Sequence, residues 1–377
     1  MAGIYLHIPF CKTRCAYCDF YSTTLPEWKE RYMKALCKEL EMRKGFLAGE
    51  KVETLYFGGG TPSQLDRKEW EEIFAALSHL CPIGQCKEIT VEANPDDLTP
   101  GYAAMLATLP FNRISIGIQT FHEPLLKLLN RRHTAKQAIE SVNNCRRAGF
   151  TNLSIDLMYG LPGETEEIWA NDLEQALKLQ PEHISAYHLT YEEGTTLWKM
   201  RCERKIKEVS EESSLAFYNM LVARLEEAGY IHYEISNFCL PGRFSRHNSN
   251  YWKGIPYLGC GPSAHSYDGQ SHRQWNTASL AAYVEGMENG TPNEEKEYLG
   301  LNTRYNEFVI TSLRTMWGMP LGKLKEAYGQ KLHDYCMACA HPYLKNGKLA
   351  VADGTLRITP KGVFISDRIM SDLLAVD

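Results

Sequence analysis

The chain has 377 residues, of which 44% are hydrophobic and 23% charged, as is usual for a globular protein. Its 41 Lys and Arg against 46 Asp and Glu give a net charge of −5, too weak to indicate a nucleic-acid or membrane partner by electrostatics alone. The opening MAGIYLHIPF does not resemble a signal peptide, and no apolar run reaches the roughly 18 residues of a membrane span. We therefore expect a cytoplasmic protein whose twelve cysteines do not form a disulfide framework.

Short apolar runs alternate with amphipathic stretches over residues 1–235. The runs predict six strands, over residues 4–8, 53–57, 89–92, 113–118, 152–157 and 183–189. Helices are expected between them, the clearest at residues 28–40, from Thr99, and at 134–148 before Gly149. Repeated strand–helix alternation predicts an α/β fold with a parallel sheet, and periodicity alone leaves a full barrel, a partial barrel and a doubly wound sheet open.

The pattern changes after residue 235. Residues 236–300 begin with a stretch rich in Gly, Pro, Asn and aromatic residues, which predicts a loop-rich connection. In residues 301–377 we expect helices at 304–313, 321–327 and 332–340, then a hairpin over 348–358 and a last helix after Pro360. This order resembles a small winged-helix-like domain. Its ten Lys and Arg against seven Asp and Glu favour a structural or docking role over DNA binding.

Three cysteines with a metal-ligand spacing follow the first predicted strand. Cys11, Cys15 and Cys18 form a C-x₃-C-x₂-C run. Three thiolates on one loop can hold three irons of a [4Fe–4S] cluster and leave the fourth iron to an external chelator. The alternative is zinc, which in structural sites usually has four ligands, with His7 as the candidate for the fourth.

The second predicted strand ends in a glycine run, Gly58-Gly59-Gly60-Thr61-Pro62, where a backbone without Cβ atoms allows a ligand close approach. The cysteine run followed by this glycine run resembles the radical S-adenosylmethionine (SAM) superfamily. That resemblance implies that SAM chelates the open iron and that the cluster cleaves it reductively. Glu92, Gln119 and Asp156 close the next three strands, and ligands of parallel α/β folds bind at this edge of the sheet.

Further motifs make the resemblance more specific. In chain order they are Tyr5-x-His7-Ile8-Pro9-Phe10-Cys11, Gly58-Gly59-Gly60-Thr61-Pro62, Glu92-x-Asn94-Pro95, Gly117-Ile118-Gln119, Asn130-Arg131 and Asp156-Leu157-Met158-Tyr159-Gly160-Leu161-Pro162. Together they resemble the oxygen-independent coproporphyrinogen III oxidase family. The resemblance implies a partial (β/α)₆ barrel with a small helical C-terminal domain. It also implies contacts to one or two SAM molecules from Tyr5, Tyr17, Gly59, Gly60, Thr61, Glu92, Gln119, Arg131 and Asp156.

Two branches of that family differ in sequence. The coproporphyrinogen dehydrogenases of porphyrin biosynthesis carry another cysteine two positions after the third, where this chain has Phe20. The heme-chaperone branch, HemW, is marked by H-N-x-x-Y-W, which this chain has at residues 247–252. The resemblance therefore implies a chaperone that binds heme and delivers it to acceptor apoproteins. The alternative is SAM-dependent oxidative decarboxylation of coproporphyrinogen III to protoporphyrinogen IX, and no catalytic residue is assigned.

Without the resemblance, the residues give less specific evidence for a heme site. His247 is a nitrogen donor able to ligate heme iron, and Tyr251 and Trp252 offer flat aromatic faces. Alternatively, this stretch closes the barrel mouth and His247 only forms hydrogen bonds within it. His265 and Cys260 are further candidate ligands. With the resemblance added, heme contact by His247 is favoured, while the oligomeric state and peripheral membrane association stay open.

Overall fold

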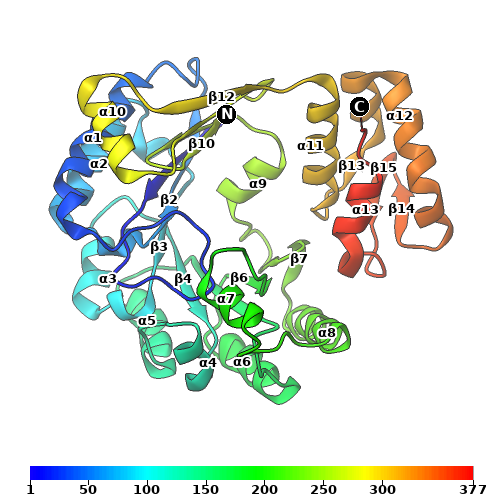
Figure 1. Cartoon of the computed structure of the whole chain (residues 1–377), viewed down its shortest axis with the longest axis horizontal. Helices are drawn as coiled ribbons and strands as arrows, with labels where there is room; N and C mark the ends of the chain where they lie inside the picture. Colours follow the sequence, from blue (N-terminus) through cyan, green and yellow to red (C-terminus); the bar gives the residue numbers. More distant parts are fainter. Residues whose placement is uncertain (377) are drawn as a thin grey trace.

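The six apolar runs form parallel strands that are neighbours in chain order (Figure 1). The computed structural model describes residues 1–376. The strands are β1 (Ala2–Ile8), β2 (Val52–Gly59), β3 (Glu88–Ala93), β4 (Arg113–Gln119), β5 (Leu153–Tyr159) and β6 (His183–His188). Residues such as Ile4, Leu55 and Ile116 are fully buried, because helices and barrel interior cover both faces of a parallel sheet. The predicted α/β fold with a partial barrel is confirmed.

Helices connect these strands and cover the outer face of the sheet (Figure 1). They are α1 (Lys29–Met42), α2 (Arg67–Ser78), α3 (Pro100–Leu106), α4 (Glu123–Leu128), α5 (Ala135–Arg147) and α6 (Glu166–Lys178). After β6 come α7 (Thr196–Cys202) and α8 (Glu211–Glu227). The side chain of Thr99 caps α3 and that of Thr134 caps α5, as the sequence predicts. Gly149 follows α5 with a φ of 101°, a conformation in which glycine carries no steric penalty.

Residues 236–300 differ from the expected loop-rich connection. They form β8 (Asn237–Cys239), α9 (Arg246–Trp252), β9 (Tyr257–Cys260), β10 (His265–Tyr267), β11 (His272–Asn276), α10 (Leu280–Asn289) and β12 (Glu294–Tyr298). β9 pairs with β1, and β10 to β12 follow it as antiparallel strands, while β8 pairs with β6 and with β7 (Ile231–Glu234). The described strands therefore form one sheet in the order β12-β11-β10-β9-β1-β2-β3-β4-β5-β6-β8-β7. Strands of three to five residues separated by Gly and Pro have too little periodicity to be seen in the sequence.

The last part of the chain is mostly helical and has its own hydrophobic core (Figure 1). It consists of α11 (Leu301–Leu313), β13 (Met319–Pro320), α12 (Leu321–Lys345), β14 (Leu349–Ala352), β15 (Thr355–Ile358) and α13 (Ser366–Asp372). Two helices were expected within α12, which is interrupted at Gly329, where φ is 86°. α11 contacts α9, so this domain packs directly against the helix that carries the H-N-x-x-Y-W motif. No helix within residues 1–376 is both long and apolar enough to cross a membrane.

Candidate functional site

Cys11, Cys15 and Cys18 lie on the loop that follows β1, and all three are free and partly buried. The Cys11 thiol is hydrogen-bonded to the Thr61 hydroxyl at 3.3 Å, which ties the loop to the glycine run after β2. Burial, together with the neighbouring thiols of Cys15 and Cys11, raises the pKa of Cys18 to about 11. Because metals bind the thiolate form, a metal held by these residues would displace their protons.

Arg131, which follows α4, places a cationic group against the cysteine loop. Its guanidinium donates to Cys15 Sγ at 3.2 Å, to Asn94 Oδ1 at 2.8 Å and to the carbonyl of Gly117. Its Nε is buried without a partner, an exception that calls for an explanation in a folded protein. Three soft thiols beside a cation with an unused donor fit an anionic thiolate cluster and the carboxylate of a bound chelator. In the described chain, no three His, Cys, Asp or Glu side chains converge on one point as ligands of a single metal ion.

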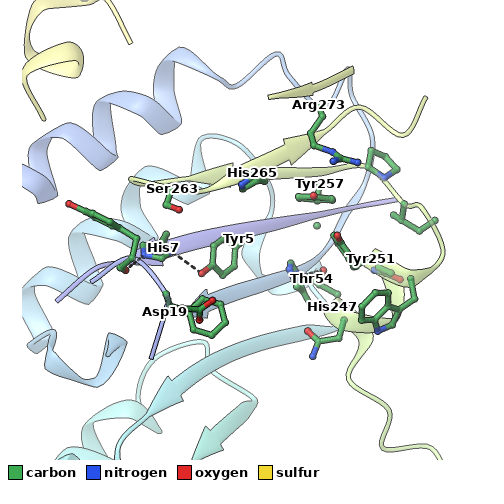
Figure 2. Close-up of a pocket in the computed structure, with 18 residues that line it drawn as sticks. Tyr5, His7, Asp19, Thr54, His247, Tyr251, Tyr257, Ser263, His265 and Arg273 are labelled. Atoms are coloured by element: carbon green, nitrogen blue, oxygen red, sulfur yellow. Dashed lines mark hydrogen bonds between the residues drawn. The ribbon is translucent and has the colours of Figure 1, made fainter. Parts of the chain in front are cut away.

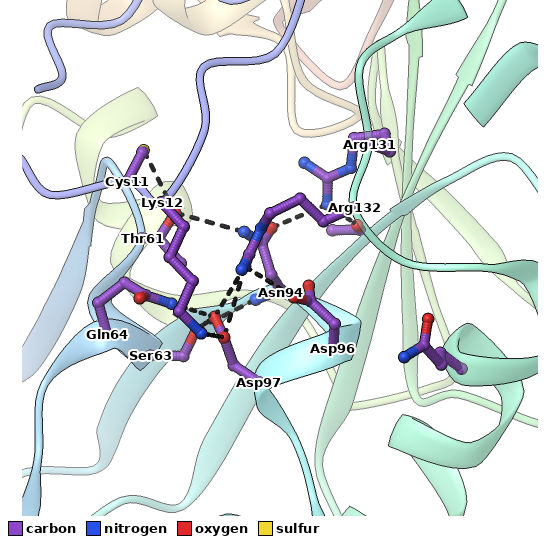
Figure 3. Close-up of polar contacts among 12 residues, drawn as sticks. Cys11, Lys12, Thr61, Ser63, Gln64, Asn94, Asp96, Asp97, Arg131 and Arg132 are labelled. Atoms are coloured by element: carbon purple, nitrogen blue, oxygen red, sulfur yellow. Dashed lines mark hydrogen bonds and ion pairs between the residues drawn. The ribbon is translucent and has the colours of Figure 1, made fainter. Parts of the chain in front are cut away.

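Asp97 holds the segments around the cysteine loop together (Figure 3). It lies just after β3 and accepts from Lys12 Nζ at 2.8 Å, Ser63 Oγ at 2.8 Å and Gln64 Nε2 at 2.5 Å. Arg132 approaches the same carboxylate at 3.4 Å. Sequence reasoning missed Asp97, because two consecutive Asp residues after a strand look like an ordinary solvated loop. Its carboxylate connects the cysteine loop, the glycine run and the segment after β3.

The glycine run allows protein segments to approach one another. A Cβ at Gly60 would lie 2.6 Å from the backbone carbon of Pro9, and one at Gly58 would lie 3.0 Å from the carboxyl group of Glu92. Gly59 has a φ of 104°, and a Cβ there would meet the ring of His7 at 2.6 Å. The sequence predicts close approach of a ligand at this run. The structure shows that the run also packs closely against the protein itself: against β1 at Gly59, against the backbone that follows β1 at Gly60 and against the Glu92 side chain on β3 at Gly58.

The predicted SAM-binding residues lie in two adjacent groups. Tyr17, Gly59, Gly60, Thr61 and Arg131 border the cysteine loop. Tyr5, Glu92 and Asp156 face the interior of the barrel from β1, β3 and β5. Gln119 lies between the two groups, because its side-chain amide and the Arg131 guanidinium both approach Gly117. A Cβ at Gly117 would lie 3.0 Å from Gln119 Nε2 and 3.3 Å from the guanidinium. That these nine residues contact SAM stays a prediction.

The side chains of the interior group are partly buried and poorly solvated. Tyr56 on β2 donates to Glu92 Oε1 at 2.7 Å, and burial raises the pKa of Glu92 to about 7. Burial likewise raises the pKa of Asp156, which receives hydrogen bonds from Ser115 at 3.4 Å. Gln119 adopts a φ of 70° at the end of β4, in a region that non-glycine residues rarely occupy and that persists only where the surrounding structure holds it. Buried acidic groups beside a strained backbone are characteristic of a binding site rather than of a strand end in solvent.

A cavity of about 650 Å³ lies beside β1, between β9 to β11 and α9, on the face of β1 that carries Tyr5 and His7 (Figure 2). The H-N-x-x-Y-W motif contributes His247, Tyr251 and Trp252 to its wall. Tyr251 and Trp252 meet edge to face, with ring centroids 4.9 Å apart. Phe20 lines the same cavity and is 66% exposed, so the residue that replaces the additional cysteine of the dehydrogenases faces this space. The cavity therefore adjoins both the motif and the cysteine loop.

His247 is held at the N-terminal end of α9. The Glu88 carboxylate accepts from the backbone N–H groups of Arg246 at 2.8 Å and His247 at 2.9 Å, which anchors the start of the helix. The His247 Nδ1 lies 3.0 Å from the Thr54 hydroxyl, and its ring lies 5.1 Å from that of Tyr56. Burial, with the nearby charge of Arg113, lowers the pKa of His247 to about 4. The imidazole is therefore neutral at physiological pH, the form that can ligate iron.

The other candidate ligands differ in access to the cavity. His265 on β10 lines it, is exposed, and stacks on Trp275 at 5.4 Å. Cys260 is fully buried and is not part of the wall. His7 also lines the cavity, but its two ring nitrogens are hydrogen-bonded to Tyr5 at 3.1 Å and to the Tyr21 carbonyl at 2.8 Å. The structure thus retains His247 and His265 as accessible nitrogen donors.

A parallel β/α sheet with three thiols after its first strand and a glycine run after its second defines a radical SAM protein. Residues 5–176 match the Radical SAM superfamily, and residues 299–365 match the HemN C-terminal domain. The chain is 33% identical over 378 residues to the heme chaperone HemW of Mycobacterium tuberculosis, covering 99% of this chain and 94% of that protein. It is 30% identical over 377 residues to the heme chaperone HemW of Bacillus subtilis, covering 99% of each. The chain therefore belongs to the HemW/HemN-like family of radical SAM proteins.

A solved structure shows the same fold. The structure of coproporphyrinogen III oxidase (HemN) from Escherichia coli superposes with a TM-score of 0.85 and 24% identity, covering 99% of this chain and 90% of that one. At this identity the likeness concerns the fold, which includes the partial barrel and the mostly helical C-terminal domain.

Proposed function

We propose that this protein is a heme chaperone that binds heme in the cavity beside α9 and delivers it to acceptor apoproteins. In this proposal Cys11, Cys15 and Cys18 hold a [4Fe–4S] cluster, and SAM binds next to it. When bound, the cluster supplies an iron that the amino and carboxylate groups of SAM chelate. The relatives named heme chaperone HemW support this function.

The observation that carries the proposal is the position of the cavity. Its wall combines His247 and the aromatic pair from α9 with Phe20 from the segment after Cys18. A neutral imidazole in a wall that also carries aromatic side chains is what a porphyrin with a central iron requires. The volume of about 650 Å³ lies within the range of pockets that enclose a molecule of this size. Heme bound here would therefore lie close to the cysteine loop.

The test is a titration of the anaerobically reconstituted protein with ferric heme, followed by absorbance. His247→Ala should weaken binding, and transfer from the protein to a heme-free globin should become less efficient. His272→Ala is the matched control, because His272 is exposed on β11 and lies outside the cavity wall. The absence of heme binding by the wild-type protein at micromolar concentration would refute the proposal.

The same preparation also tests the alternative function. The fold shared with the oxidase and the buried Glu92 and Asp156 are compatible with a coproporphyrinogen substrate. Phe20, at the position of the additional cysteine, favours the chaperone. Formation of protoporphyrinogen IX from coproporphyrinogen III, with consumption of SAM, would replace the proposed function by that of an oxidase.

A further inference from the structure

Arg273 on β11 lines the cavity (Figure 2) and lies next to the C-terminal domain. Its side chain is part of the cavity wall, next to Tyr257 and His265. The same guanidinium forms an ion pair with Glu307 on α11. One side chain therefore contacts both the candidate heme site and the domain that packs against α9.

The charge of the cavity wall is concentrated at two places. Among the described residues of the wall, Arg273 is the only Arg or Lys, and Asp19 is the only Asp or Glu. The three histidines of the wall do not add positive charge at neutral pH, because burial lowers the pKa of His7 and His247 to about 4 and partial desolvation lowers that of His265. Figure 2 shows Asp19 and Arg273 at opposite ends of the cavity. A ligand with a carboxylate is therefore attracted to the Arg273 end and repelled from the other.

We propose that Arg273 binds a carboxylate of the ligand in this cavity, and that Glu307 occupies the same guanidinium when the ligand is absent. The inference rests on the proposed function, since the carboxylates in question are the propionates of a porphyrin. It goes beyond that function by assigning the orientation of the porphyrin and a competitor from the C-terminal domain.

The geometry of the ion pair permits this exchange. Only Nη2 of Arg273 donates to Glu307, while Nε and Nη1 have no hydrogen-bond partner among the described residues. A carboxylate that takes two donors from one edge of the guanidinium fork makes a stronger contact than one that takes a single donor. The side chains of Arg273 and Glu307 are 29% and 33% exposed, and an ion pair at this exposure contributes little to stability. Replacing Glu307 by a bidentate ligand therefore costs the protein little.

The exchange of Glu307 for a ligand carboxylate leaves the other contacts between the C-terminal domain and the rest of the protein in place. Arg314, at the end of α11, is bonded to Glu234 at 2.5 Å, and its guanidinium lies 5.1 Å from the ring of Trp252. Lys253 lies 4.5 Å from the ring of Trp317. Ligand binding thus breaks the contact of α11 with β11 and keeps the contacts of the domain with α9. The C-terminal domain therefore stays in contact with α9 while Arg273 exchanges Glu307 for the carboxylate of the ligand.

The test compares three probes: metal-free protoporphyrin IX, ferric heme, and the dimethyl ester of ferric heme. The first two carry free propionates, and only the last two carry iron. Arg273→Gln should weaken binding of both free acids about tenfold, as expected for the loss of one charge-assisted contact, and leave the ester unchanged. Lys296→Gln on the adjacent strand, outside the cavity wall, is the matched control and should change none of the three affinities.

Glu307→Gln tests the competition. It should tighten binding of the free acids about threefold, because a partly exposed ion pair no longer has to be broken. The gain should disappear with the ester and in the double variant Arg273→Gln/Glu307→Gln. A loss of affinity in Glu307→Gln would show that Glu307 positions Arg273 rather than competes for it, and would overturn that part of the proposal.

The outcomes separate this inference from the proposed function. If Arg273→Gln binds acids and ester in the same ratio as the wild type, the carboxylate assignment is wrong. Heme binding that still depends on His247 would in that case leave the proposed function intact. If the wild-type protein binds none of the three probes, both are refuted.

Discussion

Thr54 on β2 offers a test of His247 that leaves the imidazole unchanged. Its hydroxyl lies 3.0 Å from His247 Nδ1, and the residue is 1% exposed. When Nδ1–H donates to this oxygen, the lone pair of Nε2 is available for iron. Thr54→Val keeps the shape of the side chain and removes the acceptor, so the tautomer and ring orientation are no longer held.

The expected loss of heme affinity in Thr54→Val can be given a range. Partners of a ligating histidine are typically worth about 10- to 100-fold in metal affinity, and a single neutral hydrogen bond contributes about 1 kcal/mol. Because one hydroxyl at 3.0 Å is involved, we expect the lower end, a loss of about tenfold in ferric heme affinity, or about 1.4 kcal/mol. The assay is an absorbance titration at neutral pH.

Thr90→Val on β3 is the matched control for this substitution. Thr90 is also fully buried in the sheet, but its hydroxyl has no hydrogen-bond partner. Its replacement should leave heme affinity unchanged. In a His247→Ala background, Thr54→Val should have no further effect, because the two residues act through one contact. Equal affinities for Thr54→Val and Thr90→Val would refute the role assigned to the hydroxyl.

Three further predictions concern the cluster and the stability of the barrel. Cys15→Ala should abolish the uptake of about four iron atoms in an iron assay after anaerobic reconstitution, whereas Cys202→Ala, at an exposed cysteine, should retain it. Gly60→Ala should lower the free energy of unfolding by about 1–3 kcal/mol in urea, because the new Cβ would meet backbone at 2.6 Å; Gly84→Ala, with nothing within 4 Å, should cost less. Burial raises the pKa of Glu164 to about 8, so the folded state keeps a proton that the unfolded chain loses above about 4.5. Relative to Glu164→Gln, the wild type should therefore lose about 1.4 kcal/mol of unfolding free energy per pH unit across that window, and a constant difference would contradict this.

The six barrel strands could be predicted because each is a run of apolar residues with turn or cap signals at its ends. The helix starts at Thr99 and Thr134 were predictable for the same reason, since a capping hydroxyl acts on the backbone three residues away. β9 to β12 could not be predicted. β9 pairs with β1, more than 250 residues earlier in the chain, and its four residues carry no pattern that names this partner.

Some residues of the candidate site could likewise be identified in the sequence, and others only in the structure. The spacing of Cys11, Cys15 and Cys18 and the H-N-x-x-Y-W motif are local and were found in the sequence. Asp97 was missed, because its significance comes from Lys12, Ser63 and Gln64, which lie in two other segments of the chain. Cys260 was retained as a candidate ligand in the sequence and excluded by its complete burial away from the cavity.

The sequence by itself determined the chemistry that this protein can offer: three thiols on one loop, a glycine run where backbones meet, and a histidine among aromatic residues. These features depend on residue types and short spacings, which local backbone geometry converts directly into structure. Only the tertiary structure decided that the histidine and the cysteine loop share one cavity and that Arg273 meets Glu307 at its rim. Those contacts join β1, α9, β11 and α11, and segments so distant in the chain come together only through the packing of the extended sheet and the C-terminal domain.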